Sequence, residues 1–104
     1  MRASLLEDFL DEEVVDKGDS PIGTLACYWE STTNHLFLGI KLTNEETVRV
    51  VPGAGAEVDQ RESRIRLGFD VSLVASAPVF DCDRELRPRL EQAANEHFAV
   101  SDLA

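Results

Sequence analysis

Hydrophobic and polar residues alternate most regularly in the first half of the chain, between positions 21 and 42. Two segments there have the pattern of β-strands, Pro21–Glu30 and His35–Leu42, and the polar tetrapeptide Ser31–Asn34 between them has the composition of a turn. In the second segment every other residue is a large aliphatic one, as in a strand with one buried face: Leu36, Leu38, Ile40 and Leu42. The pattern predicts a central β-hairpin.

Short strands are predicted on both sides of this hairpin. A first strand is expected at Glu13–Asp16, followed by a turn at Lys17–Pro21. Three more strands follow the hairpin: Thr47–Pro52, Glu57–Asp59 and Arg64–Phe69. The segment Val79–Asp83 is expected to be extended or a loop.

Two short helical turns are predicted at the ends of this strand-rich region. Ser4 and Glu7 have the spacing of a capping box, which predicts a helical turn from about Leu5 to Leu10. Asp70 is a suitable N-cap residue for a single turn at Val71–Ala75.

A C-terminal helix is predicted to begin at Pro88, since proline is favoured at the first helical position. An apolar stripe follows at helical spacing: Leu90, Ala94, His97 and Phe98. Five or six short strands followed by a helix indicate a mainly β fold, a small closed or half-closed barrel of antiparallel strands. One domain is expected over residues 1–104, with an acidic lead-in at 1–12, the barrel at 13–83, the C-terminal α-helix at 86–98 and a tail at 99–104.

The hairpin has more apolar surface than the interior of one small barrel can enclose. If the aliphatic residues of the second strand point inward, Phe37 points outward. The first strand is apolar on both faces, with Leu25, Cys27 and Trp29 on one and Ile22, Ala26 and Tyr28 on the other. The second face must be covered by the terminal helix, the N-terminal segment or another chain, because monomers seldom expose large apolar patches. The candidate interface residues, for a homodimer or another protein partner, are Tyr28, Phe37, His97 and Phe98.

The formal net charge of −10 comes from 20 acidic and 10 basic residues. An acidic surface repels phosphate backbones, which argues against a general nucleic-acid binder and leaves a basic protein partner open. No segment approaches the roughly 18 consecutive apolar residues of a membrane span. The N-terminus turns acidic where a secretory signal needs its apolar run, so a cytoplasmic location is expected.

The two cysteines, Cys27 and Cys82, are too far apart in the sequence for a CxxC site. With no export signal, two buried or inert thiols are expected rather than a disulfide. Asp81 and Asp83 flank Cys82, and neighbouring carboxylates disfavour the thiolate that a reactive cysteine needs.

No set of residues has the spacing of a catalytic, metal or cofactor site, and we expect none. His35 and His97 are the only histidines, and neither has a second neutral ligand at metal-ligand spacing; His97 is expected to be a satisfied packing residue. Asp81 and Asp83 lack the further oxygen ligands of a calcium loop. Gly53-Ala-Gly55 is not followed by the lysine of a phosphate loop, and no G-x-S-x-G elbow indicates a hydrolase.

Three arginines in and just before the predicted strand Arg64–Phe69 make a modest basic spot: Arg61, Arg64 and Arg66. Arg64 and Arg66 share one face of that strand. They are expected to pair with acidic residues on neighbouring strands, and each such exposed pair contributes under about 1 kcal/mol.

The order of these elements resembles the PRC-barrel, a family named for the cytoplasmic domain of the photosynthetic reaction centre H subunit. The strongest matching piece is Val71 to Phe80, in which a short helical segment runs into Ala77-Pro78-x-Phe80-Asp81. The other matching pieces, which together span about residues 4–98, are Ser4-Leu-Leu, Val14-Val-Asp16, Ile22-Gly23, Leu25, Trp29-Glu30, Val50-Val-Pro52 with Ala54, Arg64-Ile-Arg-Leu67 and Leu86-x-Pro88.

The chain departs from the family pattern at two places. The turn glycine that usually stands three residues before Ile22 is one place earlier, at Gly18, and Asp19 occupies its position. The terminal helix ends in Asn95-Glu-His-Phe98 instead of the family's tyrosine-rich segment and glycine.

The resemblance implies a six-stranded barrel that serves as an interaction module, frequently self-associating, with no shared catalytic site and no cofactor. It therefore predicts a non-enzymatic adaptor, a homodimer with an unknown protein partner. Because a fold does not transmit a function, a second hypothesis stays open, a small-molecule or metal-responsive sensor that binds at the barrel mouth.

Overall fold

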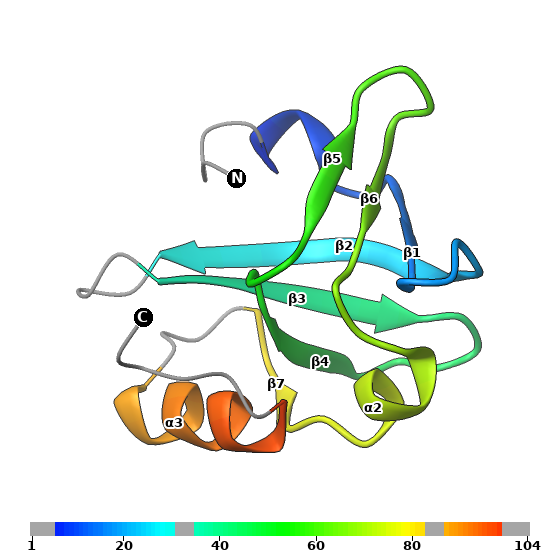
Figure 1. The fold of residues 1–104 in the computed structure, drawn as a ribbon. Coiled ribbons are helices and arrows are strands. Elements are labelled where there is room, and N and C mark those ends of the chain that lie inside the picture. Colours follow the sequence, from blue (N-terminus) through cyan, green and yellow to red (C-terminus); the bar gives the residue numbers. More distant parts are fainter. Residues whose placement is uncertain (1–5, 31–34, 83–86, 99–104) are drawn as a thin grey trace.

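The computed structural model describes residues 6–30, 35–82 and 87–98 (Figure 1). One 3₁₀ turn and two α-helices accompany the strands in this part of the chain: η1 (Glu7–Phe9), α2 (Val71–Ala75) and α3 (Pro88–His97). The strands are β1 (Glu13–Val15), β2 (Pro21–Glu30), β3 (Leu36–Leu42), β4 (Val48–Pro52), β5 (Glu57–Asp59), β6 (Arg64–Arg66) and β7 (Val79–Phe80).

The strands form one seven-stranded sheet in the order β5-β6-β1-β2-β3-β4-β7. Every neighbouring pair is antiparallel except β1 and β6, which run parallel. The mainly β class and the C-terminal helix are confirmed. The expectation of five to six antiparallel strands in a barrel is not, because the sheet has a seventh strand at β7 and one parallel pair, and its two end strands are not joined to each other in the described residues.

The sheet is strongly curled, so that both of its halves contribute to one core. In Figure 1 the β5–β6 hairpin runs steeply across the central strands β2 and β3. Ile65 of β6 and Val51 of β4 lie four strands apart in the sheet order, yet both belong to the same buried cluster. This first core also takes Leu38 and Ile40 from β3 and Val74 from α2.

The opposite face of β3 and β4 carries a second, smaller core. It is built from Phe37, Val50 and Ala94, with Trp29 and Leu90 packed against it. Since Ala94 and Leu90 belong to α3, the terminal helix covers this face, one of the three covers that the sequence left open.

A β-bulge at Ala26 decides which residues of β2 face which core. Leu25 pairs with Ile40 and Cys27 pairs with Gly39, so Ala26 is an extra residue with no partner in β3. A bulge reverses the alternation of side chains beyond it. Leu25 and Tyr28 therefore pack with the first core, and the predicted set of Leu25, Cys27 and Trp29 on one face is wrong.

Asp16 ties the turn between β1 and β2 to helix α2. This residue is 6% exposed. Its Oδ1 accepts backbone N–H groups from Gly18 at 2.9 Å and Ser20 at 3.0 Å, and its Oδ2 accepts the N–H of Val71 at 3.3 Å. The hydrogen bond from Ser20 is the largest cause that lowers the pKa of the Asp16 carboxyl, and burial opposes it.

Helix α2 begins where the sequence predicts it, but its first N–H is capped by a residue far away in the sequence. Asp70 occupies the N-cap position with an extended backbone and makes no side-chain hydrogen bond to the helix. The carboxylate that receives the Val71 N–H is Asp16. The predicted cap by Asp70 is therefore corrected.

The remaining boundaries differ from the predictions by a few residues. The strand predicted at Arg64–Phe69 ends at Arg66, and the segment expected to be extended or a loop is the short strand β7 followed by a turn. The leading helical turn is reduced to η1, with Leu6 and Phe9 buried. The Ser4 end of the predicted capping box, the turn 31–34 and the tail 99–104 lie outside the described residues.

Candidate functional site

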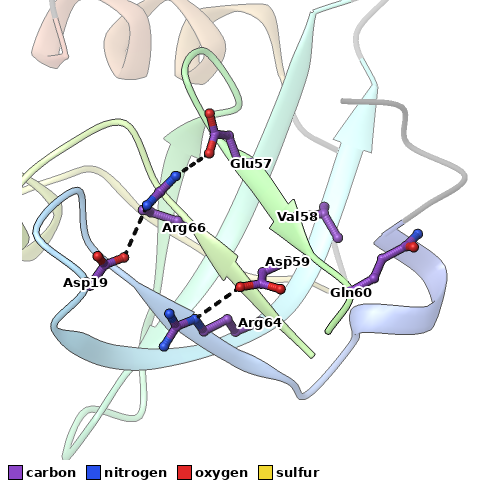
Figure 2. A pocket seen from close by; sticks show the side chains of 7 residues that line it. All are labelled: Asp19, Glu57, Val58, Asp59, Gln60, Arg64 and Arg66. Atoms are coloured by element: carbon purple, nitrogen blue, oxygen red, sulfur yellow. Dashed lines mark hydrogen bonds and ion pairs between the residues drawn. The ribbon is translucent and has the colours of Figure 1, made fainter. Parts of the chain in front are cut away.

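A hollow of about 380 Å³ lies over the β5–β6 hairpin. Residues of β5, of β6 and of the two turns next to them line it (Figure 2): Asp19, Glu57, Val58, Asp59, Gln60, Arg64 and Arg66. The antiparallel register of β5 and β6 sets Glu57 opposite Arg66 and Asp59 opposite Arg64. Because paired residues share a face, two pairs of opposite charge lie side by side.

The ion pairs predicted for the two arginines are present. Figure 2 shows Arg66 between Glu57, which it contacts closely, and Asp19, whose Oδ1 lies 3.4 Å from Nη1. Arg64 Nε lies 3.9 Å from Asp59 Oδ2. The hydrogen bond to Glu57 is the largest cause that raises the pKa of Arg66 above its ordinary value. These side chains are largely exposed, so solvent screens the pairs and they add little to the stability.

The side chains that line this hollow are of the kind that bind a ligand. They comprise three carboxylates and two guanidinium groups, which leaves one net negative charge, and they include no cysteine, serine or histidine. An incoming anion would have to displace Glu57 or Asp19 from Arg66. A cationic group would in turn have to compete with the arginines for these carboxylates, so only the single net negative charge favours a basic ligand.

The Nε2 atom of His97 acts as a hydrogen-bond donor. This atom lies 2.8 Å from the carbonyl oxygen of Leu73 and 3.2 Å from Ser76 Oγ. A carbonyl oxygen only accepts hydrogen bonds, so Nε2 carries the proton. The imidazole therefore presents no lone pair to Ser76, and the two residues are not arranged as a base and a nucleophile. His97 links α3 to the end of α2, which fits its predicted packing role.

The other three candidate interface residues pack inside the chain. Phe37 is 1% exposed in the second core, and Phe98 is 5% exposed in the first core, with its ring centroid 4.5 Å from that of Phe69. Tyr28 is half-buried against the first core. Phe37 does point away from the aliphatic side of β3, but α3 covers it, so neither buried phenylalanine is a surface residue here.

The two cysteines form a disulfide, which corrects the expectation of two separate thiols. Cys27 of β2 and Cys82, two residues after β7, have Cα atoms 6.0 Å apart. The bulge at Ala26 turns Cys27 to the second face. Gly39 leaves room for the bond, because a Cβ built on it would lie 2.6 Å from Cys27 Sγ.

The remaining sequence candidates do not gather into a site. Gly53-Ala-Gly55 lies in the turn that leads into strand β5, not in front of a helix. Asp81 stands beside the disulfide, and Asp83 lies outside the described residues. His35 precedes β3 and is half-buried. Among the residues that the structure describes, no three histidine, cysteine or acidic side chains are grouped so that they could hold a metal ion.

Sequence reasoning found two of the residues that line the hollow, Arg64 and Arg66, and missed its acidic side. Glu57 belongs to a strand that was predicted, but nothing in the sequence shows that β5 pairs with β6. Asp19 reaches the site from a distant turn. The anchoring role of Asp16 does have a sequence signal, since an aspartate followed by glycine two residues later is typical of an Asx turn.

Comparison with known proteins gives no information about this site. No family model, no curated protein and no solved structure matches the chain. Within the described residues, no helix is long and apolar enough to cross a membrane.

Proposed function

We propose that the chain is a non-enzymatic protein-interaction module of the PRC-barrel type, acting in the cytoplasm as an adaptor that self-associates. The observation that carries the proposal is the segment 71–80, the strongest piece of the resemblance. It forms helix α2 and then strand β7, which joins the edge of the sheet beside β4. The order of strands before α3 supports the same family, with the barrel opened into a curled sheet.

Asp19 gives the resemblance further support. It occupies the position at which the family usually has a glycine, and its backbone φ is +65°. Glycine adopts this left-handed region without a steric penalty, and aspartate is among the few other residues that tolerate it. The departure at Asp19 thus keeps the backbone shape that the glycine would provide.

Self-association fits the outer edge of β7, with which no strand of the described residues pairs. This strand is the last in the sheet order, and Val79 within it is 50% exposed, the most exposed large hydrophobic residue described. An unpaired strand edge with an exposed apolar side chain is a template for pairing with a second copy. We therefore assign the homodimer contact to β7, instead of the buried Phe37 and Phe98.

Light scattering at increasing concentration tests this assignment. The wild-type chain should be a dimer at micromolar concentration, and Val79→Lys should be a monomer. Leu10→Lys is the matched control, because Leu10 is 41% exposed and lies at the other end of the fold, next to η1. A wild-type chain that stays monomeric at 100 times this concentration would refute self-association.

Salt separates self-association from binding of a basic partner. Two copies that each carry a net charge of −10 repel one another, so dimerisation should strengthen as sodium chloride screens the repulsion. Binding of a lysine-rich protein segment should weaken under the same conditions. An adaptor that binds neither a second copy nor any protein captured from its native cell would contradict the proposal.

The hollow over β5 and β6 favours the second candidate function, a sensor, in the form that binds a small cationic molecule. Its volume of about 380 Å³ is large enough for a small molecule, and its net charge attracts cations. Thermal-shift screening against metal ions and basic metabolites tests it. A saturable stabilisation that Glu57→Gln removes and Glu46→Gln leaves would establish the sensor, and no stabilisation by any of them would reject it.

A further inference from the structure

The C-terminal part of the chain is attached to the rest of the fold by one short strand pairing, by the packing of one helix and by a few side chains, among them Phe80, whose ring centroid lies 4.6 Å from that of Trp29. We call residues 79–82 and 87–98, which contain β7 and α3, the C-terminal strap. Strand β7 pairs with β4 through two residue pairs, Val48 with Phe80 and Arg49 with Val79. Helix α3 packs on the second core through Leu90 and Ala94. At its end Phe98 lies in the first core and His97 Nε2 donates to the carbonyl of Leu73, so opening of the strap also removes these two contacts.

The disulfide adds a second covalent attachment between the strap and the rest of the described structure, besides the main chain between Pro78 and Val79. It joins Cys82, between β7 and α3, to Cys27 in the longest strand of the sheet. As long as the bond is intact, the helix starts six residues from a fixed point, and a helix that detaches is held close to its docking surface. Both cysteines are half-buried residues.

The hydrogen bonds just before the strap provide a place where it can hinge. The carbonyl of Pro78 accepts the N–H of Val50 at 2.9 Å, and Arg49 Nη1 donates to the carbonyl of Ala77 at 2.8 Å. Both bonds lie upstream of β7. They can persist while the residues after Pro78 move, and in the described part of the chain no other element follows α3, so opening disturbs no later strand.

We propose that the Cys27–Cys82 disulfide is a redox-controlled latch that makes the C-terminal strap part of one cooperative unit with the sheet. A dithiol reductant transfers two electrons and two protons. The bond between the two Sγ atoms breaks, both cysteines become thiols, and the reductant becomes a disulfide. The strap then opens on its own while the sheet stays folded, and Phe37 and Val50 lose their cover.

Amide hydrogen exchange followed by mass spectrometry tests the latch on the full chain. In the oxidised protein, α3 and β3 should have protection factors within about tenfold of each other, because they open together. After reduction with dithiothreitol, the protection of α3 should fall at least about tenfold below that of β3. Thiol titration of the denatured protein should give no free thiol before reduction and two afterwards.

Cys27→Ala/Cys82→Ala serves as the matched control, since it lacks the bond without any reductant. It should reproduce the exchange pattern of the reduced wild type, and dithiothreitol should leave it unchanged. Three results would overturn the proposal: two free thiols in the air-oxidised chain, equal protection of α3 and β3 after reduction, or loss of the whole fold on reduction. The wild type in its two redox states decides the question even if the double variant does not fold.

Discussion

The buried carboxylate of Asp16 should be the most stabilising single polar group in the described structure, and its removal is a sharp test. Asp16→Ala deletes the acceptor for three backbone N–H groups, those of Gly18, Ser20 and Val71. Asp16→Asn keeps an Oδ1 that can accept the first two. Its Nδ2 group is a donor and would face the Val71 N–H, which is also a donor.

The hydrogen-bond count sets the expected magnitudes. Each bond to a neutral acceptor contributes about 1 kcal/mol, and bonds to a charged acceptor contribute more. Asp16→Ala should therefore lower the free energy of unfolding by about 3 kcal/mol at pH 7. Asp16→Asn should lower it by about 1.5 kcal/mol, since one bond and the charge are lost while two bonds remain.

The pH dependence distinguishes the carboxylate from a merely well-packed side chain. The pKa of Asp16 is lower in the folded chain than in the unfolded one. The stabilisation is therefore fully present above the unfolded value near 3.8 and is lost as the pH falls through the folded pKa. Urea unfolding from pH 7 down to pH 2 should show the gap between wild type and Asp16→Asn shrinking below about pH 4.

Asp70→Asn is the matched control for this experiment. Asp70 lies next to the same helix end, but its side chain makes no cap hydrogen bond, and its only described ion pair is an exposed one with Lys17 at 3.7 Å. This substitution should change the free energy of unfolding by less than about 0.5 kcal/mol. An Asp16→Asn variant as stable as wild type at pH 7, or a gap as large at pH 2 as at pH 7, would refute the reasoning.

Three further predictions concern the disulfide, the glycine beside it and the charge. Cys27→Ala/Cys82→Ala should lower the free energy of unfolding by about 4 kcal/mol, the loop-closure value for a separation of 55 residues, and equal urea midpoints with and without reductant would contradict this. Gly39→Ala should lower the free energy of unfolding by at least about 1 kcal/mol more in the oxidised wild-type background than in the double alanine background, because the added Cβ would lie 2.6 Å from Cys27 Sγ. A double-mutant cycle measures this difference, and equal losses in the two backgrounds would show that the sulfur is not the obstacle. Raising sodium chloride from 10 mM to 500 mM should raise the urea midpoint, since the net charge of −10 repels itself in the folded chain, and a lower midpoint would show that the ion pairs outweigh this repulsion.

Much of the local structure could be predicted from the sequence, because it depends on neighbouring residues. The alternation in His35–Leu42 and the proline at the start of α3 each act over a few positions, and the strand and the helix were found within two residues of their predicted bounds. The arginine pairs over β5 and β6 were expected for the same reason, since side chains two apart in a strand share a face.

What could not be predicted depends on contacts between distant segments. The parallel pairing of β1 with β6 leaves no mark on either strand, so an all-antiparallel sheet was the natural expectation. A cap for α2 from Asp16, 55 residues earlier, cannot be seen in the residues around the helix. The disulfide was missed because the cysteines were judged by their sequence distance and by an expected compartment.

The extra residue at Ala26 has a consequence for how tolerant strand β2 is to changes in its length. Shortening the strand by this one residue would restore regular alternation and rotate every side chain after it by half a turn. Trp29 would be driven toward the aliphatic interior, and the sulfur of Cys27 would point away from Cys82. Ala26 itself belongs to neither core. Substitutions of Ala26 should thus be tolerated far better than deletion of this residue.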